Sequence, residues 1–566
     1  MNKIIRAAVI FQFLSLFTFP IAAQESPEIV KGTVDLVLRA NVTITHHPTS
    51  IETGYPSFDS LLTRFGVTSM TPAFDLPVKA EHLAVFYRLN MDEHWVVHFP
   101  DSISVHTTAT GFALDGLVES AEPISYGVAT LLPIDAGFHR QWYHNQPNGV
   151  DINSPQGWDY DTSAAGVLVA VLDEGIDSLH RELNRNLWIN AAETLATHGD
   201  PGTHQFVPDG IDDDGNGKAD DFYGWDFSGA GDADPKPDYY DNPPCTQTDL
   251  DKMNHGTRVA GVLMAQNSLW LTDGNDMVGV MWYGSVLNVK VTNPGGVTNP
   301  DKYAAAIQYA AQTGAKVISM SFAFPYPGSN LGTAVQYADQ LGSVQVAGVP
   351  NPGQDGEYPW KYPQVIGVYR IDANGQNEPH PIYRLDTTCV VAPGFNIYTT
   401  DALVPGRGWP DTLCEEFVGA DYSYLTGTSL ATPIVAGVAA MMIAHRKQLF
   451  GSLGEITPAL AREIVWWTTD DYGPPGFDSL YGRGKVNLQK AMLVVGHGDV
   501  NNDHSLDIND PVYLINYIFN GGPPPQPQVM VGDSNCDGEI DISDVVYLLN
   551  YVFEVGAPPP ICFQGP

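Results

Sequence analysis

Positive charge is scarce in this sequence. Its 566 residues include 27 lysine and arginine residues against 65 aspartate and glutamate residues, so the formal net charge is −38 at pH 7. Such a chain lacks the basic surface that attracts nucleic acid or an anionic membrane. We therefore expect neither as a partner. The acidity favours an exported protein that binds cations, although a well-solvated surface with few lysines would give the same charge.

Cysteine is scarce as well. The five cysteines are Cys245, Cys389, Cys414, Cys536 and Cys562. In an exported chain they can pair, and proximity suggests Cys389 with Cys414 and Cys536 with Cys562, with one thiol left over. None lies in a histidine motif that would compete for the chemistry, which argues against a cysteine nucleophile.

We expect no apolar run in this sequence to be long enough to cross a bilayer. Residues 1–23 have a short basic start with Lys3 and Arg6, an apolar stretch, and small residues at Ala22 and Ala23. This pattern is typical of a secretory signal peptide cleaved near Ala23, and its apolar stretch is short for a membrane span. We expect no membrane span after its removal, so the sequence indicates a secreted, extracellular protein.

The length of the chain exceeds what one hydrophobic core usually serves, and a hydrophobic content of 43% is ample for burial. We therefore expect several domains. Residues 24–130 alternate strand-like runs at 34–38 and 82–89 with an amphipathic helix at 58–65. This arrangement predicts a small α+β module.

A serine stands at the start of a predicted buried helix. After Gly427, apolar residues recur at helical spacing through Met442, with alanines and glycines between them. Pro433 comes early, where we expect its missing N–H to cost no helical hydrogen bond. The Ser429 hydroxyl would then lie among free N–H groups at the positive end of the helix dipole, where negative charge can develop. Taken alone, a serine in this place is more often a simple N-cap.

Two upstream motifs favour a nucleophile at Ser429. The buried-strand run 166–172 ends at Asp173, and His255 opens a second helix rich in small residues. In the order aspartate, histidine, serine, these segments resemble the subtilisin-like serine proteases, the subtilases of peptidase family S8. By that resemblance Ser429 attacks the scissile carbonyl, His255 transfers the proton, and Asp173 orients the imidazole.

Strands and helices alternate after His255. The expected strands are 286–291, 317–321 and 342–349, and the expected helices are 302–313 and 331–341. This rhythm predicts a mostly parallel, doubly wound α/β sheet with catalytic residues at its carboxyl edge, as the subtilase resemblance implies. We assign residues 131–495 to this catalytic domain. By position, residues 24–130 correspond to a subtilase propeptide, which assists folding and inhibits the enzyme until it is removed.

Two segments depart from the subtilase pattern. Subtilases carry an Ala-Ala-Gly-Asn element whose asparagine contributes to the oxyanion hole, and direct alignment places Val349 there. Asn351 could take this role if the loop bends toward the pocket. Ser321, Phe322 and Ala323 stand where relatives have a Ser-Leu-Gly wall beside the substrate's P1 side chain. These bulkier residues predict a narrower pocket that prefers small side chains.

An acid-rich insertion between the aspartate and histidine motifs contains a calcium-loop pattern. Asp212, Asp214, Asn216 and Asp220 have ligand-like spacing, and Gly217 permits a sharp turn. No glutamate occupies the twelfth position of this loop. A solvated acidic turn would have the same composition, but carboxylates crowded this closely favour a bound Ca²⁺.

The C-terminal residues 496–566 contain a duplicated loop followed by a helix, at 512–519 and at 545–553. Oxygen-bearing side chains recur at loop positions 1, 3, 5, 9 and 12, and position 7 would offer its carbonyl, which is the spacing of loops that wrap Ca²⁺. The two sets are Asp499, Asn501, Asp503, Ser505, Asp507 and Asp510, and Asp533, Asn535, Asp537, Glu539, Asp541 and Asp544.

This pair of loops resembles a type I dockerin. The resemblance implies a module that folds around two calcium ions and docks onto a cohesin on a scaffold or cell surface. A calcium-dependent stabilising cap without a partner is the alternative. In both cases Ca²⁺ is expected, because without it the acidic clusters would repel each other and the short helices would lack a core.

These features together predict a secreted serine endopeptidase, made as a zymogen, that acts on protein or peptide substrates and is tethered by its C-terminal module. The alternative is a catalytically weak or inactive subtilase-like binding protein, motivated by Val349. An esterase is disfavoured because no Gly-x-Ser-x-Gly element surrounds Ser429.

Overall fold

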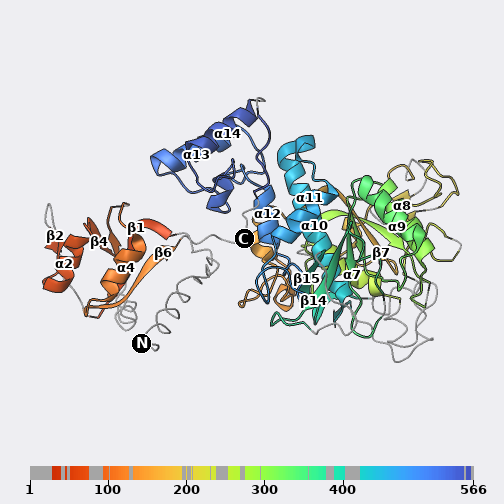
Figure 1. Cartoon of the computed structure of the whole chain (residues 1–566), viewed down its shortest axis with the longest axis horizontal. Helices are drawn as coiled ribbons and strands as arrows, with labels where there is room; N and C mark the ends of the chain where they lie inside the picture. The colour runs from red at the N-terminus through yellow and green to blue at the C-terminus, as the bar shows by residue number, and fades with distance from the viewer. Residues whose placement is uncertain are drawn as a thin grey trace, which may run out of the picture. The chain divides into compact units, whose positions relative to one another are not determined.

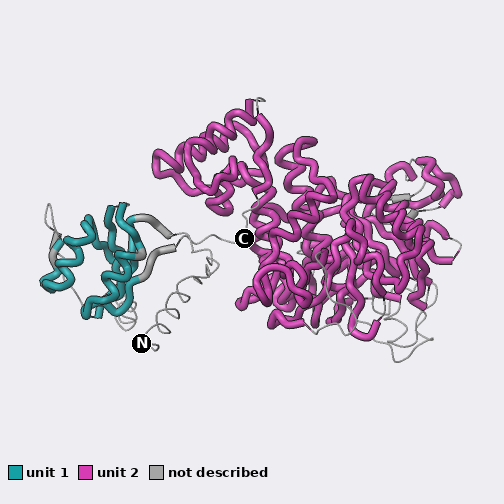
Figure 2. The backbone as a smooth tube through the Cα atoms, in the orientation of Figure 1, with its two compact units in different colours: residues 1–129 teal, residues 130–566 magenta. Residues whose placement is uncertain are grey.

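The chain forms two compact units, Met1–Ala129 and Thr130–Pro566, which Figure 2 distinguishes by colour. The computed structural model describes residues 29–39, 45–46, 51–74, 93–100, 102–125, 132–193, 199–200, 205–206, 208–229, 231–237, 253–267, 275–293, 295–354, 356–377, 388–401, 421–553 and 556–562. The expected signal peptide and the expected strand at 82–89 lie outside the described residues.

The first unit is an antiparallel sheet with two helices. The strands run in the order β4 (Ser69–Pro72), β5 (His94–His98), β1 (Ile29–Leu38) and β6 (Val118–Ser125), and the helices are α2 (Pro56–Arg64) and α4 (Val105–Ala113). A small pair, β2 (Thr45–His46) and β3 (Ile51–Glu52), lies apart from this sheet. Alternate residues of β1, Val34 and Leu36, pack with Phe58 and Phe112 of the helices because successive side chains of a strand face opposite ways.

The second unit is built on a seven-stranded sheet. Its order is β10 (Gly224–Asp226), β11 (Tyr283–Lys290), β7 (Ser163–Asp173), β12 (Val317–Met320), β13 (Val344–Gly348), β14 (Val365–Ile371) and β15 (Cys389–Pro393). Every neighbouring pair is parallel. The strands are largely buried apolar runs, as expected of a sheet covered on both faces. The doubly wound fold predicted from the sequence is confirmed.

Helices cover both faces of this sheet (Figure 1). One core contains residues of α7 (His255–Met264), α10 (Thr428–Phe450), α11 (Pro458–Trp467) and α12 (Leu488–Val495), and the other contains residues of α8 (Pro300–Gln312) and α9 (Ser329–Gln340). The shorter elements are η2 (Phe138–Arg140), α5 (Ser154–Trp158), η3 (Asn184–Asn186), β8 (Gly199–Asp200), β9 (Gln205–Phe206), β16 (Ile397–Thr400), β17 (Tyr422–Leu425) and η5 (Gly451–Gly454).

Helix α10 contradicts the expectation that no segment after the signal peptide is long and apolar enough to cross a bilayer. The segment Thr428–Gly454 is long and apolar enough to cross a bilayer, contrary to the expectation that no later segment would be. However, 94% of its most apolar window is buried inside the protein. The apolar length of α10 therefore reflects its place at the centre of the core.

The C-terminal repeat packs on the same core. Helices α13 (Asn509–Asn520) and α14 (Ile542–Val552) lie beside one another, and η6 (Val529–Gly532) precedes the second loop. Leu514 and Leu548 belong to the core that contains α10 and α12. A disulfide joins Cys536 to Cys562, as suggested. Cys389 is a buried thiol in β15, which contradicts its suggested pairing with Cys414, a residue outside the described ones.

Candidate active site

The aspartate and histidine motifs meet at the carboxyl edge of the sheet. The apolar strand β7 carries Asp173 to this edge, where its side chain is 1% exposed. His255 is the first residue of α7, and its Nδ1 lies 2.8 Å from Asp173 Oδ1. This hydrogen bond fixes the orientation of the imidazole and leaves its other nitrogen, Nε2, for the pocket.

The electrostatics of His255 favour its protonated form. Burial alone would lower its pKa, but the Asp173 carboxylate, the hydrogen bond to it and the Glu174 carboxylate together raise the pKa of His255 to about 9. The ring also makes an edge contact with Phe322, with 6.4 Å between the ring centroids. A base with this pKa accepts a proton readily but is free to do so mainly in alkaline solution.

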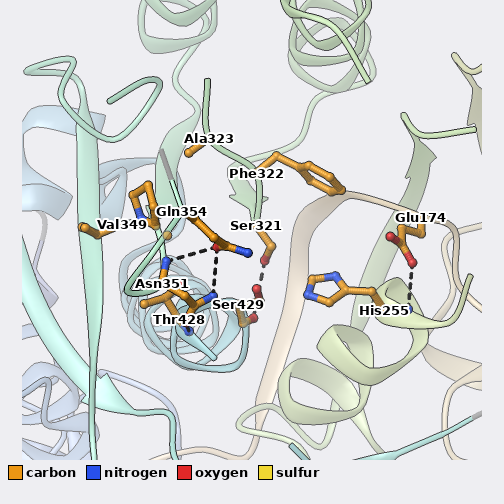
Figure 3. Close-up of a pocket in the computed structure, with 12 residues that line it drawn as sticks. Glu174, His255, Ser321, Phe322, Ala323, Val349, Asn351, Gln354, Thr428 and Ser429 are labelled. Carbon is orange, nitrogen blue, oxygen red and sulfur yellow. Dashed lines mark hydrogen bonds between the residues drawn. The ribbon is translucent and has the colours of Figure 1, made fainter. Parts of the chain in front are cut away.

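Ser429 lies across the pocket from His255, in the first turn of α10 (Figure 3). The residue is 9% exposed. Backbone N–H groups of this helix terminus lie beside it. The Thr428 N–H donates to Asn351 Oδ1 at 3.1 Å, and the Leu430 N–H donates to the Gly427 carbonyl at 3.1 Å. The Ser429 N–H is therefore the donor of this turn that we consider for the pocket. The structure thus brings all three candidate catalytic residues to one place.

The expectation for Pro433 is wrong. This proline lies inside α10, as its sixth residue, beyond the turn whose N–H groups are normally unpaired. Its missing N–H therefore deprives the carbonyl of Ser429, four residues earlier, of its helical donor. The Ser321 hydroxyl donates to that carbonyl instead, at 3.4 Å. A residue expected to line the substrate wall thus also supports the backbone of the candidate nucleophile.

A cavity of about 450 Å³ surrounds these groups. Ser321, Phe322 and Ala323 follow β12 and line it from one side, and residues 348–351 follow β13 and line it from the other. Ala323 is held against Gly356, where an added Cβ would lie 2.6 Å from the Ala323 Cβ. The three expected wall residues therefore do face the candidate triad.

Val349 and Asn351 are placed differently from one another. Val349 is fully buried in the core between the sheet and α8–α9, and its N–H donates to the Val368 carbonyl. Asn351 reaches the start of α10, where its Oδ1 accepts from the Thr428 N–H at 3.1 Å. Its Nδ2 donates to Gln354 Oε1 at 3.3 Å. The loop after Val349 thus brings the Asn351 amide to the position beside Ser429 (Figure 3).

Glu174 is a pocket residue to which sequence reasoning assigns no role. Its Oε2 accepts from the His255 N–H at 3.1 Å, and the residue is 7% exposed. Burial, opposed by the nearby His255 and reinforced by the Asp173 charge, raises the pKa of Glu174 to about 8. Its place directly after Asp173 at the strand end is the signal that could have identified it.

The acid-rich insertion gathers a different set of acids from the one expected. Asp212 and Asp214 lie with Glu193 in a group whose oxygens are within 4.8 Å of one another. Asn216 joins it through a hydrogen bond from its Nδ2 to Asp214 Oδ2 at 2.9 Å. The Asp220 carboxylate instead accepts from backbone N–H groups at the start of the loop. Glu193, 19 residues before Asp212, belongs to no motif and could not be singled out from the sequence.

The three acid-rich loops share one pattern of closure. In the C-terminal loops, Asp510 and Asp544 at position 12 accept hydrogen bonds from backbone N–H groups at positions 2 and 9. In the insertion loop Glu193 accepts from positions 2, 3 and 9. Burial raises the pKa of Asp510 to about 7 and that of Asp499 to about 6, so ionising them without a cation is costly.

Comparison with known proteins identifies both parts of the second unit. Residues 164–484 match the model of the subtilase family, and residues 497–553 match that of the dockerin type I domain. Thermitase of Thermoactinomyces vulgaris is 28% identical over 361 residues, which cover 64% of this chain and 99% of thermitase. A thermophilic serine proteinase of Bacillus sp. is 28% identical over 377 residues, or 66% of this chain and 73% of its own. Subtilisin DY of Bacillus licheniformis is 30% identical over 246 residues, or 43% of this chain and 78% of its own.

Proposed function

Because the chain belongs to the subtilase family and carries a type I dockerin domain, we propose that it is a secreted serine endopeptidase that works through Asp173, His255 and Ser429. The observation that carries this proposal is the 2.8 Å hydrogen bond from the His255 Nδ1 to the buried Asp173, made where His255 faces Ser429 across a cavity. A nucleophile, a base and a group that orients the base are the parts that acyl transfer requires.

The reaction follows from this placement. Ser429 Oγ attacks the scissile carbonyl carbon while His255 Nε2 accepts its proton, and Asp173 stabilises the imidazolium that forms. His255 then gives the proton to the leaving amine, which breaks the peptide bond and leaves an acyl group on Ser429. Water, deprotonated by His255, releases this acyl group and restores the hydroxyl.

The negative oxygen formed in each step needs donors. The Ser429 N–H in the first turn of α10 supplies one side of the oxyanion hole, and we assign Asn351 Nδ2 to the other side. Gln354 Oε1 accepts from one of the two hydrogens of that amide nitrogen in the substrate-free protein, which leaves the second hydrogen to donate to the oxyanion. This assignment removes the reason for considering an inactive binding protein, because Val349 is not the residue asked to donate.

The substrate is a peptide whose P1 side chain lies along Ser321, Phe322 and Ala323. The Phe322 ring lies between His255 and Tyr303, at 6.4 and 6.1 Å from their ring centroids, so it narrows this side of the cavity. We therefore expect small P1 residues to be preferred. Cleavage profiling with a peptide library measures this, and a dominance of large aromatic P1 residues would contradict it.

The acidic loops fit Ca²⁺. Carboxylate and amide oxygens are the ligands that this cation prefers, and each loop holds buried acids: Asp499 and Asp510, Asp533 and Asp544, and Glu193 at the insertion. In the dockerin domain the residues that would hold Ca²⁺ are the predicted ligands of the two C-terminal loops, which begin at Asp499 and Asp533 and end at Asp510 and Asp544. In the insertion Asp212, Asp214 and Asn216 would hold the ion, with Glu193 closing the loop in place of a twelfth-position residue. Bound Ca²⁺ would neutralise these acids and so stabilise the folded loops.

The remaining parts regulate and locate the enzyme. We propose that the first unit is a propeptide, removed by the enzyme itself, and that the dockerin domain docks onto a cohesin of a scaffold or cell surface. The α+β architecture of the first unit supports the former role. The dockerin match supports the latter.

Casein hydrolysis by the full chain tests the proposal, with wild type compared with Ser429→Ala and the N-terminus of the product sequenced. We expect the wild type to digest casein and to trim its first unit, and the variant to do neither. Labelling of Ser429 by a fluorophosphonate tests the nucleophile independently of the substrate. A folded, calcium-loaded wild type that neither cleaves nor labels would refute the proposed activity.

A further inference from the structure

The dockerin domain is fixed to the catalytic domain through its first loop. Asn502 of this loop donates from its Nδ2 to the Asp159 carbonyl at 2.9 Å. Near the end of α10, Arg446 donates to the carbonyls of Val495 and Pro559. These contacts bring the loop, α10 and the segment before β7 together at one junction.

Three metal-binding side chains converge at this junction. Asp161 comes from the segment before β7, His445 from the end of α10, and His504 from the first dockerin loop. One donor atom from each lies within 4.8 Å of the others, and His445 Nδ1 is 4.0 Å from Asp161 Oδ2. None of the three belongs to the proposed triad or to a calcium-ligand set.

The two histidines present unused donor atoms. The Nδ1 atoms of both His445 and His504 are buried and make no hydrogen bond within the part of the chain that the structure describes. The His445 side chain is 2% exposed, and burial, aided by the nearby His504 and Arg446, lowers its pKa to about 3. A buried neutral imidazole with no partner for a ring nitrogen is costly, unless that nitrogen binds something.

The two dockerin loops differ in the residue at loop position 6. Loop position 6 is Gly538 in the second loop, with φ +88°, and an added Cβ there would meet nothing within 4 Å. His504 holds the same position in the first loop with φ +65°, a conformation that disfavours histidine relative to glycine. The first loop therefore places the His504 imidazole at the junction with a backbone conformation that glycine would adopt more easily.

We propose that Asp161, His445 and His504 form a binding site for a transition-metal ion, Zn²⁺ by its donor set, that clamps the dockerin domain to the catalytic domain. Two imidazoles and one carboxylate suit Zn²⁺, whereas the oxygen-only loops suit Ca²⁺. Donors of a tetrahedral zinc site lie about 3.3 Å apart, given metal–ligand distances of about 2.0–2.2 Å, so His445 and Asp161 need to approach by less than about 1 Å. Water completes the fourth position.

Zinc titration of the full chain with Ser429→Ala, which prevents autolysis, tests the site in saturating Ca²⁺. Calorimetry is expected to show one tight Zn²⁺ ion per chain, and Co²⁺ in its place should give the visible absorption of a tetrahedral site. His504→Gly, which copies the second loop, should weaken Zn²⁺ binding by more than about 100-fold, because losing even an outer-shell partner costs about 10–100-fold. Its Ca²⁺ stoichiometry should be unchanged.

Two further variants keep the test decisive. Asp161→Asn lies outside the loop and should also weaken Zn²⁺ binding, whatever His504→Gly does to Ca²⁺. His139→Ala removes an exposed imidazole elsewhere and should bind Zn²⁺ as the parent chain does. Absence of tight Zn²⁺ binding in the parent chain, or equal binding in the parent, His504→Gly and Asp161→Asn chains, would overturn the proposal.

Discussion

The candidate active site and the dockerin loops of this protein are built in opposite ways. The active site draws its residues from the ends of β7, β12 and β13 and from the starts of α7 and α10. Each dockerin loop is a run of twelve consecutive residues closed by its own last aspartate. An assembled site depends on the whole sheet and acts as a unit, whereas a contiguous loop depends on its own segment and its cation. A substitution in the candidate active site should therefore impair the site as a whole, whereas a substitution in a dockerin loop should affect mainly that loop and its cation.

The largest expected effect is at the assembled site. Ser429→Ala should lower kcat for a peptide substrate by about 10⁶-fold, because the triad acts as one unit and the remaining groups cannot replace its nucleophile. Thermal unfolding should change little, since the hydroxyl faces the cavity. Initial rates and a melting curve measure both. Residual activity within ten-fold of wild type would show that another residue is the nucleophile.

Removal of Ca²⁺ should have the next largest effect, confined to the contiguous loops and the insertion. Chelation should unfold the dockerin domain, because the binding energy of its ions is part of its folding energy and the buried acids lose their counter-charge. Calorimetry of the Ser429→Ala chain with and without chelator measures this as the loss of one transition. A dockerin transition unmoved by chelation would contradict Ca²⁺ binding there.

Asn351→Ala sharpens the comparison within the assembled site. It should lower kcat by about 10²–10³-fold with little change in KM, because the lost donor acts on charge that exists only in the transition state. Gln354→Ala is the matched control, since it removes the amide's partner and leaves the donor in place. If the two variants lose activity equally, Asn351 is a structural residue and the oxyanion hole has another donor.

Glu193→Gln tests the insertion loop, in which a contiguous run of residues is closed by a glutamate from outside the run. The charged carboxylate accepts backbone hydrogen bonds from three loop positions while 1% exposed, so its loss should destabilise the insertion by about 1.5–3 kcal/mol. Unfolding in denaturant at fixed Ca²⁺ measures this. Asp213→Asn is the control, because Asp213 is exposed and lies outside the group of three acids.

The smallest effect concerns pH. The carboxylate of Glu174 helps to raise the pKa of His255, so Glu174→Gln should lower that pKa and move the acidic limb of kcat/KM to lower pH. The glutamine can still accept the His255 N–H, which keeps the local geometry. An acidic limb that stays in place or moves to higher pH would show that Glu174 does not act on His255 through its charge.

The same contrast explains what could be read from the sequence. Asp173, His255 and Ser429 each end or begin a regular element with strong periodicity, so their motifs were recognisable, and a parallel sheet brings such ends to one edge. The contiguous dockerin loops were recognisable by spacing alone. These features can be recognised without knowing which distant segments come together in the fold.

Other residues depend on that meeting and could not be predicted. Glu193 closes a loop from 19 residues away, and no spacing rule connects it to Asp212. His445 and His504 meet only because the dockerin domain packs on the end of α10. The error at Pro433 has a similar cause. The sequence does not fix the first residue of the helix to better than about one turn, and the role of the proline depends on how far it lies from that residue.

Helix α10 joins the two regions mechanically. Ser429 stands in its first turn and His445 sixteen residues later, so about 24 Å of continuous helix separates the proposed nucleophile from the dockerin junction. The helix therefore serves as a strut. The dockerin domain packs near one end of this helix, and the cavity beside Ser429 lies at the other end. A cohesin bound to the dockerin domain, as proposed above, would therefore attach the protein near the end of this helix opposite to Ser429.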